Sequence, residues 1–540
     1  MRYSAVIIVL AGTLLCLLLG VLRDSVWYIP LVVLGPLSLL GIWDLTQTKH
    51  SICRNYPLLG RLRFLQEMIR PEIHQYYVES DLDGRPYNRD ERSLIYERAK
   101  NVSGLKPFGT EMDVYGDEYE WLDHSIAPRP KQDNPFRITV GGPDCKQPYS
   151  CSVLNISAMS FGAISPNAIE ALNRGAKKGN FYHCTGEGGL SSYHLKNGGD
   201  LVWQIGTGYF GCRDQNGAFD PGLFREQALT PQVKMIEIKI SQGAKPGHGG
   251  VLPAAKITPE IARTRKIPMG RDCISPPGHT TFDSPRGLCE YVKQLRDLSD
   301  GKPIGFKLCV GHRHEFLAIC KAMLETGILP DFITVDGGEG GTGAAPNEFS
   351  DSIGTPLKMG LMFVHNALVG CGLRDKIRIA ASGKVSSAFA IARNLAIGAD
   401  WCNAARGFMM AVGCIQAQSC HTNRCPVGVA TQDPVRQRAL DVGDKGERTY
   451  HFHHNTMETL SEIVAAAGID HPSEFRPYHI HIALSRTNVK NYQEAHPFLQ
   501  SGELLNNCQH PDFKTHWDIA SAESFQAQGA DAKIQQELAT

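Results

Sequence analysis

Eight short apolar runs recur along the middle of the chain, and each ends in glycine or small polar residues before a stretch with helical periodicity. The runs cover residues 153–158, 181–185, 202–205, 235–240, 304–310, 332–335, 377–381 and 401–404. Segments 166–178, 313–326 and 385–395 have the apolar spacing of helices. Parallel strands that are buried on both faces form continuous apolar runs of this kind. The pattern therefore predicts an α/β fold, a (β/α)8 TIM barrel, with a doubly wound open sheet as the main alternative.

Two longer apolar runs precede the predicted barrel, at residues 5–22 and 26–43. The first carries no charge and is long enough to cross a bilayer, whereas Pro30 and Pro36 interrupt the second. Together they predict a transmembrane helical hairpin over residues 1–45. A cleaved signal peptide is the alternative, although Arg2 is the only basic residue before the first run and no A-x-A site follows it.

Basic residues predict the orientation of this hairpin. Arg23 lies between the two runs, and five basic residues follow the second run: Lys49, Arg54, Arg61, Arg63 and Arg70. Because positively charged loops stay on the cytoplasmic side, we expect an anchor in the inner (cytoplasmic) membrane and a catalytic domain in the cytoplasm.

The rest of the chain divides by composition. Residues 46–136 form a polar linker with helices expected at 62–79 and 90–100, and residues 137–434 form the barrel. A helical extension is expected over 435–500 and a loosely ordered polar tail over 501–540. The net charge is zero and 20% of the residues are charged, which excludes nucleic acid as an expected partner. The 16 cysteines are mostly scattered singly, which favours a reducing compartment.

The loops that follow the predicted strands are rich in glycine. They read A-M-S-F-G-A-I-S-P at 158–166, T-G-E-G-G at 185–189, K-I-S-Q-G-A-K-P-G-H-G-G at 239–250, V-D-G-G-E-G-G-T-G-A-A-P at 335–346, S-G-K-V-S-S at 382–387 and A-R-G at 405–407. Glycine lets the backbone approach a ligand closely, and in a barrel these loops share one end. One such loop would indicate only a turn, whereas six at one end predict a binding pocket.

The last two of these loops have the features of a phosphate site. Ser382 and Gly383 offer N–H groups at the start of a helix expected from Ser386, and Arg406 with Gly407 can close the other side. A phosphate-bearing cofactor is therefore expected.

Lys307 projects from the fifth predicted strand toward the barrel mouth, where a cation beside a flavin would stabilise the reduced ring. The alternative is a strand-end lysine that extends to solvent.

Residues 413–434, G-C-I-Q-A-Q-S-C-H-T-N-R-C-P-V-G-V-A-T-Q-D-P, contain Cys414, Cys420 and Cys425. The spacing C-x5-C-x4-C fits neither a zinc knuckle of paired C-x2-C units nor a four-cysteine ferredoxin run. Spacing alone leaves two interpretations open. One is an iron–sulfur cluster without a fourth protein ligand, and the other is three buried structural thiols.

Residues 150–433 resemble the FMN-binding synthase domain of glutamate synthase. The motifs that carry the resemblance are A-M-S-F-G-A-I-S-P, T-G-E-G-G, K-I-S-Q-G-A-K-P-G, I-S-P-P, G-G-T-G-A and G-C-x5-C-x4-C-P-V-G-V-A-T-Q-D-P. In that family the three cysteines bind a three-iron, four-sulfur cluster. The resemblance therefore implies that Cys414, Cys420 and Cys425 hold a 3Fe-4S cluster.

The resemblance also implies a cofactor site and a substrate site. The residues implied to line the FMN site are Met159, Ser160, Gln204, Lys307, Gly338, Gly341, Thr342 and Gly383. Those that match the family's 2-oxoglutarate pocket are Glu187, Lys239, Gln242 and Lys245. The chemistry agrees, because a dicarboxylate needs cations and hydrogen-bond donors. Glu187 instead suits ammonia or an imine nitrogen as a general acid or base, with a structural carboxylate that caps the glycine-rich turn as the alternative.

The implied reaction is a reductive amination. Ammonia condenses with 2-oxoglutarate to 2-iminoglutarate, reduced FMN delivers a hydride to the imine carbon to give L-glutamate, and the cluster passes electrons to the flavin. No glutaminase domain is expected ahead of the barrel, so ammonia would come from solution or from a separate subunit. The expected electron donor is a ferredoxin or an NAD(P)H-oxidising subunit, and a homo-oligomer is left open.

Two positions depart from the family pattern. His248 stands where the family has glutamate in K-P-G-E-G-G, and the pair Glu339-Gly340 enlarges the loop at 335–346. Both changes lie where the substrate or the nitrogen donor is expected.

Two alternative functions follow from these departures. One is an N-methylglutamate synthase-like enzyme that uses an amine, and the other is a membrane-tethered electron-transfer or sensor subunit without synthase activity. Lys239, Gln242 and Lys245 argue against the second, because an electron relay needs no dicarboxylate clamp.

Overall fold

The computed structural model describes residues 2–102, 104–133, 136–506 and 508–529. The chain separates into two compact units, one before and one after the boundary between Asp90 and Glu91. This boundary falls inside the segment 46–136 that composition predicts to be a linker.

The first unit begins with a helical hairpin. Helix α1 (Ser4–Leu22) packs directly against helix α2 (Leu31–Thr46). The short 3-10 helix η1 (Ser25–Tyr28) connects the two. Gly41 makes close packing possible, because a Cβ there would lie 2.5 Å from the Val6 side chain. Two helices are long and apolar enough to span a membrane, Ser4–Leu22 and Ser25–Thr46. Length and composition are the grounds for this, and a signal sequence near an N-terminus meets the same criterion.

A buried ion pair connects the hairpin to the helices that follow it, α3 (Ser51–Asn55) and α4 (Leu59–Ile73). Asp44 is fully buried and lies 2.7 Å from the Arg61 guanidinium, and it also accepts a hydrogen bond from the Leu58 N–H. The helix predicted at 62–79 is confirmed, although it begins earlier and ends in the single π-helical stretch η2 (His74–Val78).

The second unit is built on a closed barrel of eight parallel strands, which confirms the predicted TIM barrel and excludes the open sheet. In order around the barrel the strands are β4 (Leu154–Ile156), β5 (His183–Cys184), β6 (Leu201–Ile205), β7 (Val233–Lys239), β10 (Ile304–Leu308), β11 (Phe332–Asp336), β12 (Arg378–Ser382) and β13 (Trp401–Ala404). Each strand overlaps one of the eight apolar runs, because strands that are buried on both faces are mostly apolar.

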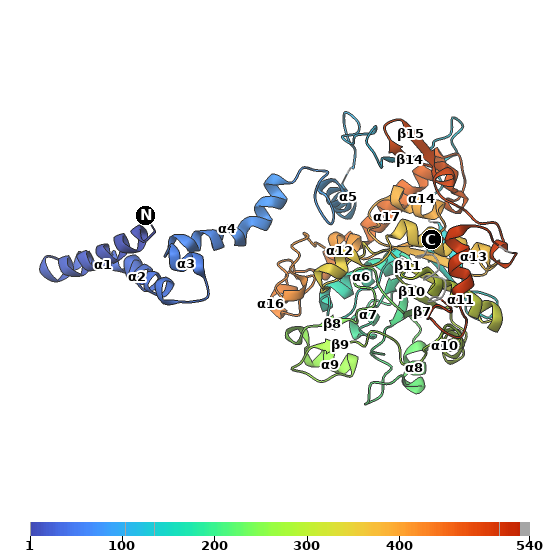
Figure 1. Cartoon of the computed structure of the whole chain (residues 1–540), viewed down its shortest axis with the longest axis horizontal. Helices are drawn as coiled ribbons and strands as arrows, with labels where there is room; N and C mark the ends of the chain where they lie inside the picture. Colours follow the sequence, from blue (N-terminus) through green and yellow to red (C-terminus); the bar gives the residue numbers. More distant parts are fainter. Residues whose placement is uncertain (1, 103, 134–135, 507, 530–540) are drawn as a thin grey trace. The chain divides into compact units, whose positions relative to one another are not determined.

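Helices surround the barrel (Figure 1). They are α6 (Pro166–Gly179), α7 (Ser192–Leu195), α8 (Pro221–Ala228), α10 (Pro285–Leu298), α11 (Arg313–Thr326), α12 (Asn347–Ser352), α13 (Leu357–Gly370), α14 (Ala388–Ala396), α15 (Arg406–Ala411), α16 (Pro434–Gln437) and α17 (Val442–Ala466). The starts of α6, α8 and α10 share one signal, a Ser or Asp that caps the helix followed by proline at its first position. The helices predicted at 166–178 and 313–326 are confirmed.

Helix α14 begins later than the pattern predicts. The side chain of Ser387 accepts a hydrogen bond from the Ala390 N–H at 3.1 Å, so the helix starts at Ala388 and not at residue 385 or 386. An N-cap with extended backbone ends the loop at this point.

A long insertion separates β7 from β10. It contains β8 (Val251–Leu252), the 3-10 helix η3 (Ala254–Lys256), α9 (Pro259–Arg265) and β9 (Cys273–Ile274), and β8 pairs antiparallel with β9. The residues of this insertion reach back to the loops at the C-terminal end of the barrel, as described below.

Helix α5 (Arg89–Lys100) lies outside the barrel and confirms the helix expected at 90–100. The strands outside the barrel have no clear sequence signal. In one sheet β14 (Ile480–Ser485) pairs with both β1 (Glu120–Leu122) and β15 (Asn488–Asn491), and in another β2 (Arg137–Val140) pairs with β3 (Tyr149–Ser152). Between α17 and the C-terminal segment lie η5 (Pro472–Glu474), η6 (Pro477–His479) and α18 (Tyr492–Ala495). The extension at 435–500 is therefore a helix followed by part of a sheet, and not helical throughout.

Two elements of the C-terminal segment are folded, which corrects the expectation of a loose tail for residues 503–505 and 511–519. The 3-10 helix η7 (Glu503–Leu505) and helix α19 (Pro511–Ile519) belong to the folded unit. Phe513 is 3% exposed, and its ring stacks on Phe363 of α13 at 5.4 Å. Residues 530–540 of the predicted tail lie outside the described residues.

Replacement of Phe513 by alanine tests this packing. Loss of a buried aromatic side chain is expected to lower the free energy of unfolding by about 3 kcal/mol. The measurement is denaturant unfolding of the full chain, with Leu505→Ala as a control because Leu505 is 51% exposed. Equal stability of the two variants would show that the segment does not pack as described.

Candidate functional site

The glycine-rich loops converge at the C-terminal end of the barrel. A Cβ on Gly186, whose φ is +65°, would lie 2.6 Å from the Ser160 backbone nitrogen, so the loops after β4 and β5 touch. A Cβ on Gly243 would lie 1.7 Å from the Gly337 carbonyl oxygen, so the loops after β7 and β11 touch as well. Glycine is required at these positions because no side chain fits between the two backbones.

Glu187 and Lys239 form the central charged pair of this end. The Glu187 carboxylate lies 3.0 Å from Lys239 Nζ, and the two side chains are 14% and 11% exposed. Gly206 and Gly250 make room for the carboxylate, since a Cβ on either would lie within 2.4 Å of its oxygens. Burial alone would raise the pKa of Glu187, but the charges of Lys239, Arg265 and Lys245 outweigh burial and lower this pKa. The carboxylate is therefore ionised at neutral pH.

Lys245 provides a second cation in the same loop as Lys239. Its Nζ donates to the Ala344 carbonyl oxygen at 2.8 Å. Burial, together with the charge of Lys239, lowers the pKa of Lys245 to about 8. Gln242, which lies between the two lysines in the sequence, is half-buried. His248 contacts Phe349 edge-on, with the two ring centroids 5.3 Å apart. Glu187, Lys239 and Lys245 are thus brought together as one charged group.

Lys307 lies beside this group, on β10. Its Nζ is 3.1 Å from the Asp336 carboxylate of β11, which also accepts the Gly243 N–H at 2.9 Å. Burial would lower the pKa of Lys307, but Asp336 and Glu237 outweigh burial and raise it. The alternative of a lysine that extends to solvent is wrong, because Lys307 is only 6% exposed.

Gln204 is fixed in the barrel interior by Glu237. The Gln204 side-chain amide donates to one Glu237 oxygen at 2.6 Å, and the Thr334 hydroxyl donates to the other at 2.6 Å. The Glu237 carboxylate therefore joins β6, β7 and β11 below the charged group.

The loops expected to hold a phosphate are also adjacent. Arg406 donates to the Glu339 carbonyl oxygen at 2.6 Å, and a Cβ on Gly341 would lie 2.7 Å from the Arg406 side chain. Gly383 has a φ of +150° and lies next to Gly337, whose N–H donates to the Ser382 carbonyl at 2.8 Å. The other residues assigned to this end are Met159, buried after β4; Ser160, half-buried; Gly338, whose N–H donates to the Thr355 carbonyl at 2.8 Å; Thr342, exposed; and Gly407, buried against α17. Their contact with FMN stays a prediction.

The cysteine loop, residues 413–434, is held against the loop after β4. The Gln432 side-chain amide donates to the Gly162 and Ile164 carbonyls at 3.2 and 2.9 Å, and the Ser165 N–H donates to the Val429 carbonyl at 2.8 Å. Gln416, Gln418 and Asn423 of this loop have φ angles of 58°, 53° and 61°. Left-handed conformations of non-glycine residues cluster at functional sites.

The three thiols of this loop are close enough to influence one another. Burial raises the pKa of Cys414 to about 12 and that of Cys420 above its usual value, and the charges of the neighbouring cysteines contribute in the same direction. Soft thiol donors of this kind suit an iron–sulfur cluster. Among the described residues, no group of three or more His, Cys, Asp or Glu side chains could hold a single metal ion. The donor type and the shared loop fit a cluster, whereas a mononuclear site is not found.

Several residues of the site were not predicted from the sequence. Glu237 and Asp336 had a usable signal, because each lies two residues along a strand from an inward-facing side chain, Lys239 or Thr334. Arg265 had none. It belongs to the insertion, is 4% exposed and donates to the Phe161 carbonyl at 2.7 Å, so only the folded chain brings it behind Glu187.

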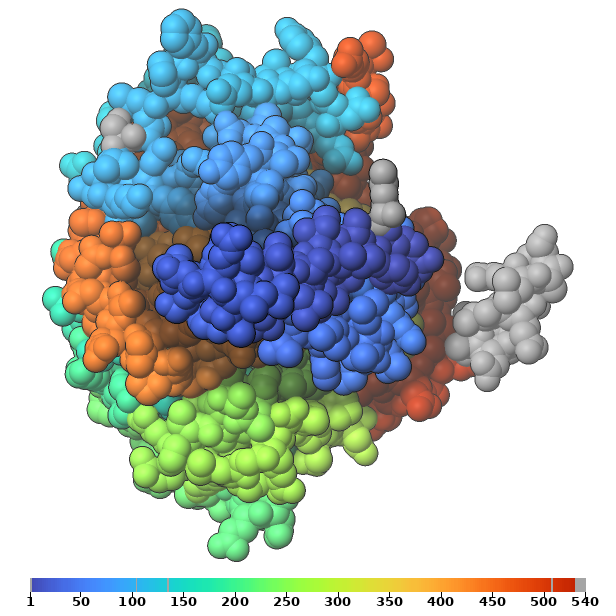
Figure 2. All heavy atoms as spheres, turned by 90° about the vertical axis from the view of Figure 1, so that its left-hand side faces the viewer, coloured from blue at the N-terminus to red at the C-terminus, as the bar shows by residue number. Residues whose placement is uncertain are grey.

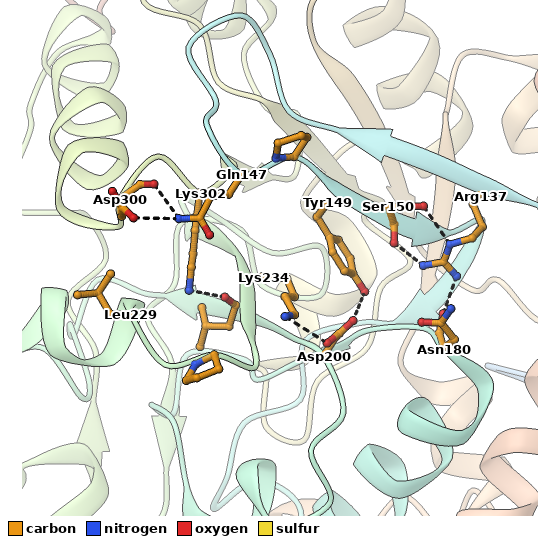
Figure 3. Close-up of a pocket in the computed structure, with 13 residues that line it drawn as sticks. Arg137, Gln147, Tyr149, Ser150, Asn180, Asp200, Leu229, Lys234, Asp300 and Lys302 are labelled. Carbon is orange, nitrogen blue, oxygen red and sulfur yellow. Dashed lines mark hydrogen bonds and ion pairs between the residues drawn. The ribbon is translucent and has the colours of Figure 1, made fainter.

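A separate pocket of about 590 Å³ lies at the opposite end of the barrel, where the strands begin (Figure 3). Its polar groups are paired within the protein: the Tyr149 hydroxyl donates to Asp200 at 3.0 Å, and Lys302 Nζ donates to three backbone carbonyls at 2.6–3.2 Å. Residues at this end of a barrel serve stability, so we place the reaction at the other end.

Gly243 offers a test of the site's construction. Gly243→Ala is expected to force apart the loops after β7 and β11, because the new Cβ would lie 1.7 Å from the Gly337 oxygen. We expect a lower melting temperature. Gly278→Ala is the matched control, because nothing lies within 4 Å of a Cβ at Gly278. A wild-type melting temperature in Gly243→Ala would contradict the described loop contact.

Comparisons with known proteins agree with the motifs. The family described as conserved region in glutamate synthase matches residues 144–470. The glutamate synthase large subunit-like protein YerD of Bacillus subtilis (strain 168) is 37% identical over 480 residues, which cover 81% of this chain and 91% of that protein. The archaeal glutamate synthase (NADPH) of Methanocaldococcus jannaschii is 32% identical over 375 residues, which cover 68% of this chain and 67% of that protein.

Solved structures add no functional argument. A flavocytochrome b2 variant aligns with a TM-score of 0.42 and 12% identity over 83% of this chain and 97% of that chain. Because this score is low, the assignment of the barrel is based on the pairing of its own strands. The family match, by contrast, spans more than half of the chain, and the chain belongs to the glutamate synthase family.

Proposed function

We propose that this protein is an FMN-dependent oxidoreductase that makes L-glutamate from 2-oxoglutarate and ammonia or an amine, and that its N-terminal hairpin anchors it to the cytoplasmic membrane. The observation that carries the proposal is the charged group of Glu187, Lys239 and Lys245 at the catalytic end of the barrel, beside Lys307. Relatives named as glutamate synthases support the choice of substrate.

Lys239 and Lys245 suit the two carboxylates of 2-oxoglutarate. Lys245 has a single carbonyl partner, and Lys239 is paired with Glu187. A bound dicarboxylate would therefore compete with Glu187 for Lys239. Charge-assisted hydrogen bonds to carboxylates are among the stronger polar contacts in proteins, and a half-buried Gln242 could add a neutral donor.

Glu187 suits proton transfer to and from the nitrogen. Condensation of ammonia with the keto carbon releases water and needs protons moved between nitrogen and oxygen, and reduction of the resulting imine needs a hydride and a proton. FMN, when bound, supplies the hydride. A carboxylate that loses Lys239 to the substrate would have a higher pKa, which is the direction a general acid needs.

Lys307 and the glycine-rich loops would hold FMN. Lys307 would place its cation at the flavin ring, while Gly383 and Arg406 would face the phosphate. Met159, Ser160, Gln204, Gly338, Gly341, Thr342 and Gly407 complete the proposed cofactor residues. Cys414, Cys420 and Cys425 would hold a 3Fe-4S cluster that supplies single electrons from a ferredoxin or an NAD(P)H-oxidising partner.

An anaerobic half-reaction tests the proposal. The reduced full-length protein is mixed with 2-oxoglutarate and ammonium, methylamine or glutamine, and flavin reoxidation is followed together with the amino acid formed. We expect reoxidation with one glutamate, or one N-methylglutamate, per flavin. Glu187→Gln should slow this step by about 100-fold or more. If 2-oxoglutarate reoxidises the flavin in none of these arms, the proposed function is wrong.

Lys245 makes substrate binding depend on pH. Because the pKa of Lys245 is about 8, its ammonium form is complete well below that pH and is lost above it. We expect the dissociation constant of 2-oxoglutarate, measured by calorimetry on the oxidised protein, to rise by about tenfold from pH 7 to pH 9. Lys245→Arg should flatten this dependence, since guanidinium stays charged. Parallel profiles for the two proteins would assign the pH dependence to another group.

A further inference from the structure

Lys256, at the end of η3 in the insertion, makes contacts that the proposed reaction does not explain. Its side chain is buried, with the residue 3% exposed, and its Nζ donates to three backbone carbonyls. The acceptors are Ala163 at 2.7 Å in the loop after β4, and Cys420 and Ala430 at 3.3 Å each in the cysteine loop. One ammonium group therefore joins the insertion, a proposed flavin loop and the cysteine loop.

A second contact joins the same two segments. The Asn423 side-chain amide donates to the Ala255 carbonyl at 3.2 Å, next to Lys256. In Figure 2 the orange surface of the segment after β13 lies next to the light green surface of the insertion. The insertion thus forms hydrogen bonds with the cysteine loop at two neighbouring residues, Ala255 and Lys256.

Among the described residues, no carboxylate forms an ion pair with the Lys256 ammonium. The other lysines buried near the flavin and substrate residues include Lys239, paired with Glu187, and Lys307, paired with Asp336. For Lys256 the described residues provide carbonyl acceptors but no ion pair with Asp or Glu. Its Nζ contacts the main chain of Cys420, one of the three cysteines of the loop. A negative group bound at these cysteines would supply the opposite charge that a buried ammonium lacks.

Lys302 shows what a purely structural lysine looks like in this protein. It too is buried and donates to three carbonyls, those of Ala228, Thr230 and Val233, but it lies at the opposite end of the barrel and faces a pocket (Figure 3). No cysteine is among its hydrogen-bond acceptors, in contrast to Lys256. Lys302 is therefore a matched control for Lys256.

We propose that Lys256 is a positioning residue that balances the negative charge of a cluster on Cys414, Cys420 and Cys425, and thereby raises its reduction potential while it fixes the cysteine loop against the flavin loop. Reduction of the cluster adds one negative charge. A fixed cation in a poorly solvated site stabilises that charge more than it stabilises the oxidised form. The proposal rests on the cluster assigned under the proposed function.

The test is a redox titration of the full-length protein in lipid nanodiscs, followed by electron paramagnetic resonance, with iron and sulfide analysis of each sample. Lys256→Gln keeps hydrogen-bond donors but removes the charge. We expect it to shift the reduction equilibrium of the cluster at least tenfold toward the oxidised form, which is about 59 mV for one electron. Lys256→Arg should stay within threefold of the wild type, and Lys302→Gln should match the wild type.

The outcomes separate this inference from the function on which it rests. A wild-type protein without iron and sulfide would overturn the cluster, and the inference with it. With the cluster present, a wild-type potential in Lys256→Gln, or equal shifts in the Gln and Arg variants, would overturn the role of the charge. Loss of the cluster from both variants would overturn it as well. Loss from Lys256→Gln with a near-wild-type potential in Lys256→Arg would support it.

Discussion

A lysine can be buried at the mouth of a barrel only if its charge is compensated, and this constraint organises the catalytic end of the protein. Lys239 is compensated by Glu187 and Lys307 by Asp336, while Lys245 and Lys256 rely on backbone carbonyls. The two ion pairs fix geometry in the absence of substrate. For the two lysines without an ion pair, Lys245 and Lys256, we propose an added negative group: a dicarboxylate shared with Lys239 in one case and a cluster in the other.

The charged pairs depend on close contacts between loops. Gly243 and Gly337 bring the loops after β7 and β11 within a distance that excludes any side chain, and the Gly243 N–H is then in reach of Asp336. Asp336 in turn holds Lys307. A backbone contact, a carboxylate and a cation therefore form one unit, and the two glycines help to set the position of Lys307 through Asp336.

The cysteine loop, for which we propose a role in electron entry, is held beside the loops of the barrel mouth. Gln432 and Lys256 hold it against the loop after β4, and a Cβ on Gly343, in the loop after β11, would lie 3.6 Å from the Cys420 side chain. Electron transfer benefits from short, fixed separations, and these contacts supply rigidity on two sides. The N-terminal unit has its own fixed point in the Asp44–Arg61 pair, which joins the apolar hairpin to the helices after it.

The sequence by itself determined the barrel. Each strand is buried on both faces, so its apolar run is visible without knowledge of its neighbours, and helix starts such as Ser165-Pro166 carry local caps. Local sequence features also identified the glycine-rich loops and the three cysteines.

Only the tertiary structure decided which charges pair, because Glu187 and Lys239 are far apart in sequence and the insertion folds back to bring Arg265 and Lys256 to the site. It also ordered residues 503–505 and 511–519, whose polar sequence hides one buried aromatic, Phe513. Local sequence patterns indicate which segments are buried. Which charges form ion pairs depends instead on distances that are set only when the chain folds.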